Sequence, residues 1–434
     1  MTLTGRILPA LALLSSLLLF AGCMQDKCDR TQQYVRYDPV YLTEDGIRVN
    51  VSVSGPEELR RPGNLYYYNG YLLINELMRG IHVIDNHDPA KPVNVAFIEI
   101  PGNRDIAVRN NILYADMFID LVAVDITDIL NPSIVCRVEN VFSQYYTFTV
   151  DHGYVVDYVP TSVSEEVDCS DSRWGSPWWR GVDDVLWLSS EKNIDFVLDA
   201  GTSAGLSAGS ANSTGIAGSM ARFTLAKDHL YTLDLALMHV FKLEGSCPEK
   251  QNSVDVRWGI ETLFPYQDYL FIGSNNGMLI YDNANASLPV YLSEFAHAQS
   301  CDPVFVSDDI AYVTLRNGTT CQNFINQLDV LDVSNIRVPQ LIKSYPMQHP
   351  HGLSVAGETL FLCEGQFGLK VFDVADKTAI ASNLLSHIDG IHAFDVIALP
   401  QSPVAMVIGD DGLYQYNVSD RTRPVFLSKI GINR

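Results

Sequence analysis

The segment "IHVIDNHDPAKP" (81–92) decides the fold of this chain, because similar segments return along the sequence. The clear copies are "VAVDITDILNP" (122–132), "MLIYDNANASLP" (278–289), "LDVLDVSNIRVP" (328–339), "LKVFDVADKTAI" (369–380) and "LYQYNVSDRTRP" (413–424); a weaker copy, "MHVFKLEGSCP" (238–248), carries Lys242 in place of the aspartate. Each copy is a run of β-forming residues that ends in Asp or Asn and leads into a polar turn. Repetition at a period of about 40 residues indicates a repeat architecture.

The sequence around each copy completes a unit of four short antiparallel strands. A strand–turn–strand pattern precedes it, for example "NLYYYNGYLLIN" (64–75), "DIAVRNNILYAD" (105–116), "TFTVDHGYVVDY" (147–158) and "RFTLAKDHLYTL" (222–233), and an apolar run such as "VNVAFIEI" (93–100) follows it. Four-stranded units at this period predict an all-β fold, a β-propeller, in which ring closure buries both faces of each sheet. We count eight units and therefore expect eight blades, with seven blades as the alternative. The third unit begins at 147–158 and is interrupted by an insertion at about 160–217.

The repeated segments resemble a known family. "VIDNHDP", "AVDITD", "DVLDVSN" and "KVFDVAD" are similar to the repeats of LVIVD-repeat proteins, which are bacterial and archaeal cell-surface proteins, and the resemblance covers about residues 60–431. It implies a propeller at the cell surface. It implies no particular reaction, since these proteins mostly lack an assigned activity.

The N-terminus has the pattern of a targeting segment. Arg6 precedes the apolar run "ILPALALLSSLLLFAG" (7–22), which ends in "LLFAGC" (18–23). This ending resembles the lipobox of bacterial lipoproteins, which implies cleavage before Cys23 and lipid attachment there; Met24 then favours the outer membrane, on its periplasmic face or at the cell surface. A plain secretory signal is the alternative. We therefore predict a signal peptide (1–22), a lipidated tether and N-terminal segment (23–58) and a propeller (59–434).

Charge and missing motifs exclude several functions. The formal net charge of −22 argues against a nucleic-acid partner, which would require a basic face. The sequence contains no GxGxxG, GxxxxGK[ST], HExxH or GxSxG motif, so no cofactor is expected. The cluster of His82, Asp85, His87 and Asp88 could suggest a metal site. However, the other clear copies have Ala, Leu, Asp, Lys or Tyr at the position of His82, so we interpret Asp85 as a turn-capping residue and expect no metal.

One face of a propeller is the better place to look for function. The loop leading into the first strand of each blade and the loop after its second strand surround the same mouth of the central channel. The candidate binding residues at these positions are Arg222, Glu261, Asp302, Arg316, His349, His351, Glu364 and His392. They predict a polar, largely acidic funnel for a sugar, a peptide or a cation. The alternative is that strand ends are polar because they meet water.

Two further features depart from the repeat. The insertion contains Trp174, Trp178 and Trp179, which could stack on a sugar or bind a protein partner, or could instead plug the channel or pack the third blade. Cys301 and Cys321 flank one unit on the mouth side and are a candidate disulfide, with a free buried thiol as the alternative. The stretch 201–219, rich in Gly and Ser, is expected to be a flexible return.

These features together favour a lipid-anchored, monomeric propeller of the cell envelope. Its expected role is non-enzymatic binding or scaffolding of a glycan, a peptide or a partner protein. The alternative is a hydrolase or lyase acting on envelope or extracellular polysaccharide through the His, Glu and Arg residues of the mouth. The sequence does not decide whether the protein is an enzyme.

Overall fold

The computed structural model describes residues 29–168, 178–180, 186–188, 216–274, 276–296, 303–316 and 325–432. The chain divides into two compact units, Met1–Val40 with Asp157–Asn193 and Tyr41–Val156 with Ile194–Arg434. The first unit contains most of β1 (Asp29–Leu42) and β12 (Gly153–Asp168), together with β13 (Trp178–Arg180) and β14 (Leu186–Leu188). No helix in the described part of the chain is long and apolar enough to cross a membrane.

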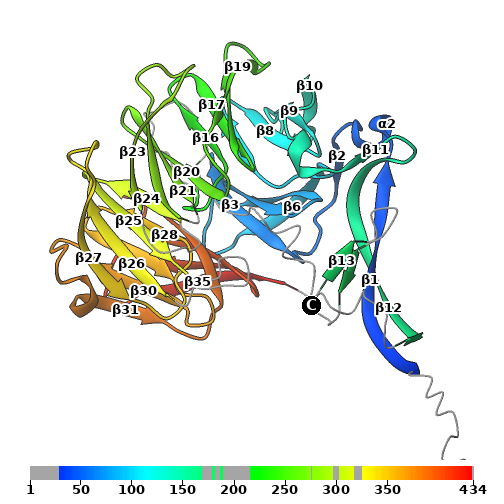
Figure 1. Cartoon of the computed structure of the whole chain (residues 1–434). Helices are drawn as coiled ribbons and strands as arrows, with labels where there is room; N and C mark the ends of the chain where they lie inside the picture. The colour runs from blue at the N-terminus through cyan, green and yellow to red at the C-terminus, as the bar shows by residue number, and fades with distance from the viewer. Residues whose placement is uncertain are drawn as a thin grey trace, which may run out of the picture. The chain divides into compact units, whose positions relative to one another are not determined.

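The second unit is built from seven four-stranded blades (Figure 1). Blade 1 contains β3 (Pro62–Tyr68), β4 (Tyr71–Glu76), β5 (Gly80–Asp85) and β6 (Val93–Glu99); blade 2 contains β7 (Ile106–Arg109), β8 (Ile112–Met117), β9 (Asp120–Asp125) and β10 (Ser133–Val138); blade 3 contains β16 (Phe223–Ala226), β17 (His229–Asp234), β18 (Leu237–Lys242) and β19 (Glu249–Asp255). Blade 4 contains β20 (Ile260–Tyr266), β21 (Tyr269–Ser274), β22 (Gly277–Asp282) and β23 (Val290–Ala296); blade 5 contains β24 (Val304–Ser307), β25 (Ile310–Leu315), β26 (Gln327–Asp332) and β27 (Gln340–Pro346). Blade 6 contains β28 (Leu353–Ala356), β29 (Thr359–Cys363), β30 (Leu369–Asp373) and β31 (Leu384–Ile388); blade 7 contains β32 (Ala393–Ala398), β33 (Val404–Gly409), β34 (Gly412–Asn417) and β35 (Val425–Gly431).

Short elements surround the blades. Two extra strands widen blade 1: β2 (Ser52–Ser54) pairs with its outermost strand β6, and β15 (Ile216–Ala217) pairs with its innermost strand β3. The helical turns of the described residues are α2 (Glu44–Ile47), η2 (Ser143–Tyr145) and η5 (Ile380–Ser382).

The predicted fold class, an all-β propeller of four-stranded antiparallel blades, is confirmed. The innermost strands of blades 2 to 7 pack on one another in sequence order, and β3 of blade 1 packs on β32 of blade 7. Blade 1 meets blade 2 through a hydrogen bond of 2.9 Å from Asn64 Nδ2 to Asp105 Oδ1, which closes the ring.

The described chain forms eight sheets, and seven of them contain the four consecutive strands of the repeat. The eighth has five strands in the order β11-β12-β1-β14-β13, where β11 is Phe148–Thr149. The hairpin at 147–158, expected to begin the third blade, thus pairs in this other sheet. The reason is that β12 runs on to Asp168 instead of turning into the next strand of a blade, so blade 2 packs directly on blade 3.

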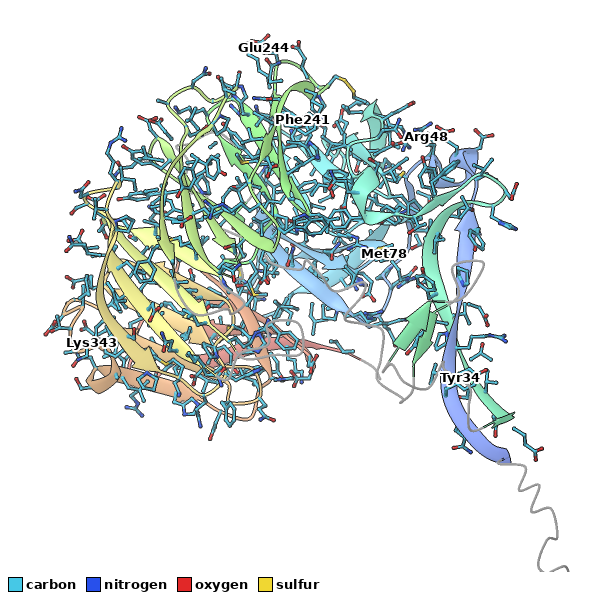
Figure 2. All side chains as sticks on the ribbon, in the orientation of Figure 1. Tyr34, Arg48, Met78, Phe241, Glu244 and Lys343 are labelled. Atoms are coloured by element: carbon cyan, nitrogen blue, oxygen red, sulfur yellow. A yellow bond between two sulfur atoms is a disulfide. The ribbon has the colours of Figure 1, made fainter. Side chains whose placement is uncertain are left out.

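Continuous apolar strands supply the core, as expected for sheets that are buried on both faces. The third strands are almost entirely inaccessible; in β18, for example, Met238, Val240 and Phe241 have no exposed surface. Figure 2 shows Phe241 inside its blade and Glu244 and Lys343 on the outside. Burying one such large side chain stabilises the fold by roughly 1.5–3 kcal/mol, so a charge at any of these positions would be strongly destabilising.

The aspartate that marks each repeat is a turn-capping residue, as the sequence predicts. Its Oδ1 accepts a hydrogen bond from the backbone N–H two residues later, for example from His87 to Asp85 at 3.1 Å. The same bond occurs at Asp125, Asp282, Asp332, Asp373 and Asn417. His87 also contacts Asp85 through Nδ1 at 2.7 Å. Among the described residues, no group of three or more His, Cys, Asp or Glu side chains could hold a metal ion.

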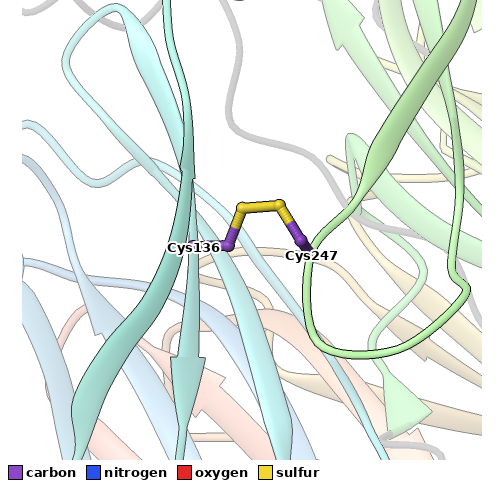
Figure 3. The surroundings of a disulfide bond; sticks show 2 residues. All are labelled: Cys136 and Cys247. Atoms are coloured by element: carbon purple, nitrogen blue, oxygen red, sulfur yellow. A yellow bond between two sulfur atoms is a disulfide. The ribbon is translucent and has the colours of Figure 1, made fainter.

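Blade 3 lacks this aspartate and is held differently. Cys247, in its turn between β18 and β19, forms a disulfide with Cys136 in β10 of blade 2 (Figure 3). The sequence does not predict this pairing, because the two residues are 111 positions apart and only the ring brings them together. Cys301 and Cys321, the predicted pair, lie outside the described residues. Cys363 is a buried free thiol.

Candidate functional site

Seven residues, one from each blade, occupy equivalent positions at or near the start of the innermost strand. The first and second strands of every blade share one equivalent pair, such as Leu65 with Ile74 in blade 1, and the residue just before that pair on the first strand is the equivalent position. In blade order these residues are Asn64, Asp105, Arg222, Thr262, Pro303, Gly352 and Asp395. The seven are chemically different, so the repeat does not dictate them. Two are aspartates, and their surroundings differ.

Both carboxylate oxygens of Asp105 accept hydrogen bonds from neighbouring blades. Its Oδ1 accepts hydrogen bonds from Asn64 Nδ2 at 2.9 Å and the Tyr66 hydroxyl at 3.2 Å, and its Oδ2 accepts from the N–H groups of Arg222 at 2.7 Å and Phe223 at 2.9 Å. The carboxyl group therefore joins blades 1, 2 and 3 around the channel. Burial raises the pKa of Asp105, while these donors oppose the shift.

A short segment of the chain lies inside the channel. Residues 216–221, which we call the channel strand, begin with β15 paired to β3. Gly218 N–H then donates to Leu65 O at 3.1 Å, Ser219 Oγ accepts from Leu353 N–H at 2.7 Å, and Ala221 O accepts from Leu263 N–H at 3.0 Å. These partners belong to the innermost strands of blades 1, 6 and 4. The expectation of a flexible return over 201–219 is thus wrong for its last residues, while 201–215 lie outside the described residues.

Asp395 contacts the channel strand through one carboxylate oxygen, and its other oxygen has no hydrogen-bond partner. Its Oδ1 accepts hydrogen bonds from Ser219 N–H at 3.2 Å and Ser219 Oγ at 3.1 Å, whereas its buried Oδ2 has no hydrogen-bond partner. The side chain is 3 % exposed, and burial raises its pKa to about 7. Two glycines leave room for it, since a Cβ at Gly218 would lie 1.6 Å from Oδ2 and one at Gly352 would lie 2.2 Å from Oδ1.

Asp395 lines a cavity of about 340 Å³ at the mouth of the channel. The channel strand contributes Met220 to the wall, the segment before blade 1 contributes Arg60 and Arg61, and blades 1, 5, 6 and 7 with their loops contribute the rest. Its polar and aromatic lining consists of Arg60, Arg61, Asn64, Arg316, His351, Phe394, Asp395 and Asp410. Three arginines beside two aspartates, one of them with a raised pKa, make the lining cationic.

A chain of contacts connects three residues of the mouth. Arg316 Nη1 lies 2.9 Å from His351 Nδ1, and His351 Nε2 lies 3.0 Å from His349 Nδ1. Burial and the neighbouring guanidinium group of Arg316 hold the pKa of His351 well below its ordinary value, so the imidazole is neutral at neutral pH. The Phe394 ring lies against the His351 ring, with 5.2 Å between the ring centres.

A second histidine lies on the other side of Phe394. The His392 and Phe394 ring centres are 4.9 Å apart, and His392 Nδ1 lies 2.5 Å from Asp410 Oδ2. Both residues of this pair are half-buried. The Phe394 ring therefore lies between the imidazoles of His351 and His392, which gives the mouth an aromatic surface beside charged groups.

The structure gathers half of the predicted residues into this site. Arg316 and His351 line the cavity, and His349 and His392 contact its lining. Glu364 instead forms an ion pair with Lys370 and accepts from Gln348 N–H at 2.7 Å. Arg222 places its guanidinium group over the Tyr145 ring, at 5.0 Å from the ring centre.

The remaining predicted residues do not line the cavity in the described structure. Glu261 is partly buried and is absent from the cavity wall, and Asp302 lies outside the described residues. Of the insertion tryptophans, Trp174 also lies outside them; Trp178 and Trp179 form part of β13. In the part of the chain that the structure describes, Glu76 and Asp116 do not contribute to the expected acidic funnel, because they bind backbone N–H groups of the loops that lead into the blades.

Sequence reasoning missed several cavity residues, namely Arg60, Arg61, Met220, Phe394 and Asp395. One signal was available for Asp395, because "FDVIA" (394–398) aligns with "RDIAV" (104–108), which puts Asp395 at the start of an innermost strand as it does Asp105. The arginines lie before the first blade and Met220 follows the insertion, so no repeat position predicts them.

The fold and this site define a β-propeller with a cationic pocket at one mouth of its channel. No protein-family model and no curated protein sequence matches the chain. A protein from Bacteroides uniformis, provisionally assigned as a 6-phosphogluconolactonase, has a similar structure: the TM-score is 0.51 at 11 % identity, over 86 % of this chain and 97 % of that one.

Two other solved structures are similar over much of the chain. A Bacteroides fragilis protein with the same provisional assignment gives a TM-score of 0.46 at 10 % identity, over 94 % of this chain and 97 % of that one. The computationally designed Ika8 protein gives 0.47 at 9 % identity, over 86 % and 88 %. At these identities the likeness to the Bacteroides uniformis protein concerns the propeller fold alone.

Proposed function

We propose that the mouth cavity binds an anionic glycan, one that carries carboxylate groups, and that the protein serves as a binding module. The observation that carries this proposal is the concentration of Arg60, Arg61 and Arg316 in one cavity of a chain whose net charge is −22. Guanidinium groups bind carboxylates through paired hydrogen bonds, and a local cationic site attracts an anion that the rest of the surface repels.

The aromatic lining supports a sugar as the bearer of the charge. Phe394 is only partly buried and lies in the cavity wall beside Asp395 and Asp410. A sugar ring offers C–H groups that pack on such a ring and hydroxyl groups that bond to carboxylates. The blades hold these groups rigidly, so little ordering entropy is lost when the ligand binds.

We further propose that this module belongs to the LVIVD-repeat family and is anchored in the bacterial envelope through Cys23. The repeat segments and the lipobox-like "LLFAGC" support this assignment. Residues 1–28 lie outside the described structure, so the sequence is its basis. Changing Cys23 to Ser should remove lipid labelling and release the protein from the membrane fraction; labelling that persists in C23S would contradict the anchor.

Calorimetric titration with oligogalacturonate tests the binding proposal, with neutral cello-oligosaccharides of equal length as the comparison. We expect binding of the charged sugar only, weakening as salt is added. The double variant Arg60→Gln/Arg61→Gln should reduce affinity at least tenfold. Arg423→Gln, which removes a charge from the exposed turn between β34 and β35, is the matched control and should bind normally. Equal binding of charged and neutral sugars would contradict the proposal.

A further inference from the structure

We propose that the same cavity also cleaves its ligand, by β-elimination in a polysaccharide of 4-O-linked uronic acids, with His351 as base and Asp395 as acid. This inference rests on the proposed binding of an anionic glycan. It goes beyond binding because it assigns a reaction and two catalytic residues.

The first support is the geometry around Asp395. At the equivalent position of blade 2, both carboxylate oxygens of Asp105 accept hydrogen bonds from neighbouring blades, as expected for a structural role. Asp395 lines the cavity and is only 3 % exposed, yet its Oδ2 has no hydrogen-bond partner. Gly218 and Gly352 clear the space that the carboxyl group occupies. A carboxyl group in such surroundings retains its proton near neutral pH and can donate it.

The second support is His351, in the wall of the same cavity. Its Nδ1 faces Arg316 at 2.9 Å, and its Nε2 faces His349. When a ligand carboxylate takes the guanidinium group of Arg316, Nδ1 loses this donor and its lone pair becomes available. Burial, the larger cause of the lowered pKa of His351, remains, while the positive charge of Arg316 that adds to it is neutralised at the same time. Binding of the anion therefore turns His351 into a base.

The step is balanced and needs no other reactant. His351 Nδ1 removes the proton from C5 of the uronate, and the electron pair of that bond forms the C4–C5 double bond. The C4–O bond breaks, and its oxygen takes the proton from Asp395 Oδ2. Arg316 stabilises the negative charge that builds up on the ligand carboxylate. The products are an unsaturated uronate and a free hydroxyl group, and solvent returns a proton from His351 to Asp395.

The experiment incubates the full chain with polygalacturonate and, separately, with alginate, and follows the ultraviolet absorbance of the new conjugated double bond. We expect turnover of at least one polyuronide by the wild type. Asp395→Asn and His351→Gln should each reduce the rate by about 10²–10⁴-fold, the usual contribution of an acid or a base. Asp395→Asn should still bind oligogalacturonate, because Arg60, Arg61 and Arg316 remain. The control Asp332→Asn lies in a capped turn where Asn417 occupies the equivalent position, and it should keep the wild-type rate.

The outcomes separate this inference from the binding proposal. Bound oligogalacturonate without any double bond formed would overturn the elimination and leave the binding module intact. Failure to bind would overturn both. A rate unchanged in either Asp395→Asn or His351→Gln would overturn the role of that residue, and thermal unfolding of each variant shows whether a lost rate reflects lost structure.

Discussion

The boundary between blades 2 and 3 and the inner end of blade 7 use the same kind of residue in opposite ways. At the boundary, Asp105 binds donors from three blades, and the Cys136–Cys247 disulfide joins the same two blades at their outer strands. At blade 7, the equivalent Asp395 binds only the channel strand and its own backbone, and it leaves one oxygen without a partner. Equivalent positions of a repeat can therefore serve stability in one blade and chemistry in another.

The largest expected effect is at Asp105. Asp105→Ala leaves the buried N–H groups of Arg222 and Phe223 and the amide of Asn64 without their acceptor, which should cost at least about 3 kcal/mol of unfolding free energy. Asp395→Ala should cost less than half as much. Denaturant unfolding of both variants measures the difference in unfolding free energy, and equal losses would show that the two aspartates contribute equally to stability.

Removal of the disulfide should have the next largest effect. Changing Cys136 and Cys247 together to Ser should destabilise the fold by about 2–4 kcal/mol, since the bond closes a long loop between two blades. Thermal unfolding under non-reducing conditions measures the loss. Binding at the mouth should remain unchanged, because the bond lies on blades 2 and 3 and the cavity is lined by other blades; a loss of affinity would show that the two regions are coupled.

A methyl group in the channel strand tests how tightly Asp395 is enclosed. Gly218→Ala should cost about 1–3 kcal/mol, because its Cβ would overlap Asp395 Oδ2 and the strand must shift. Gly55→Ala, whose Cβ would meet no atom within 4 Å, is the control and should be nearly neutral. Chemical denaturation compares the two, and an unperturbed Gly218→Ala variant would mean that the carboxyl group is not confined.

The smallest expected effect is a pH dependence of stability. Asp395 titrates near 3.8 when unfolded and near 7 when folded, so the folded chain holds an extra proton between these values. The stability that this proton contributes is complete below about pH 4 and is lost as the pH rises to 7. The Asp395→Asn variant cannot lose this proton, so its stability relative to the wild type should improve by about 1 kcal/mol between pH 5 and 6. A pH-independent difference between the two proteins would show that Asp395 is already ionised.

Much of the mouth was predictable, and the exceptions have a common cause. Arg316, His349, His351 and His392 are found by asking which residues at the strand ends the repeat does not require. Glu364 passes the same test but is bound by Lys370, and a pairing between neighbouring strands is not visible in the repeat pattern. The Cys136–Cys247 bond was missed for the same reason, since it depends on which blades become neighbours.

The four-stranded unit, its apolar core and its capped turns follow from the amino-acid sequence, because strand patterns and turn chemistry are local and return along the chain. Three features instead depend on the folded chain: blade 2 packs on blade 3, the channel strand pairs with β3, and Asp395 lies against Gly218 and Gly352. These contacts join residues far apart in the chain. Their energies depend on which groups become buried together, which no local pattern records.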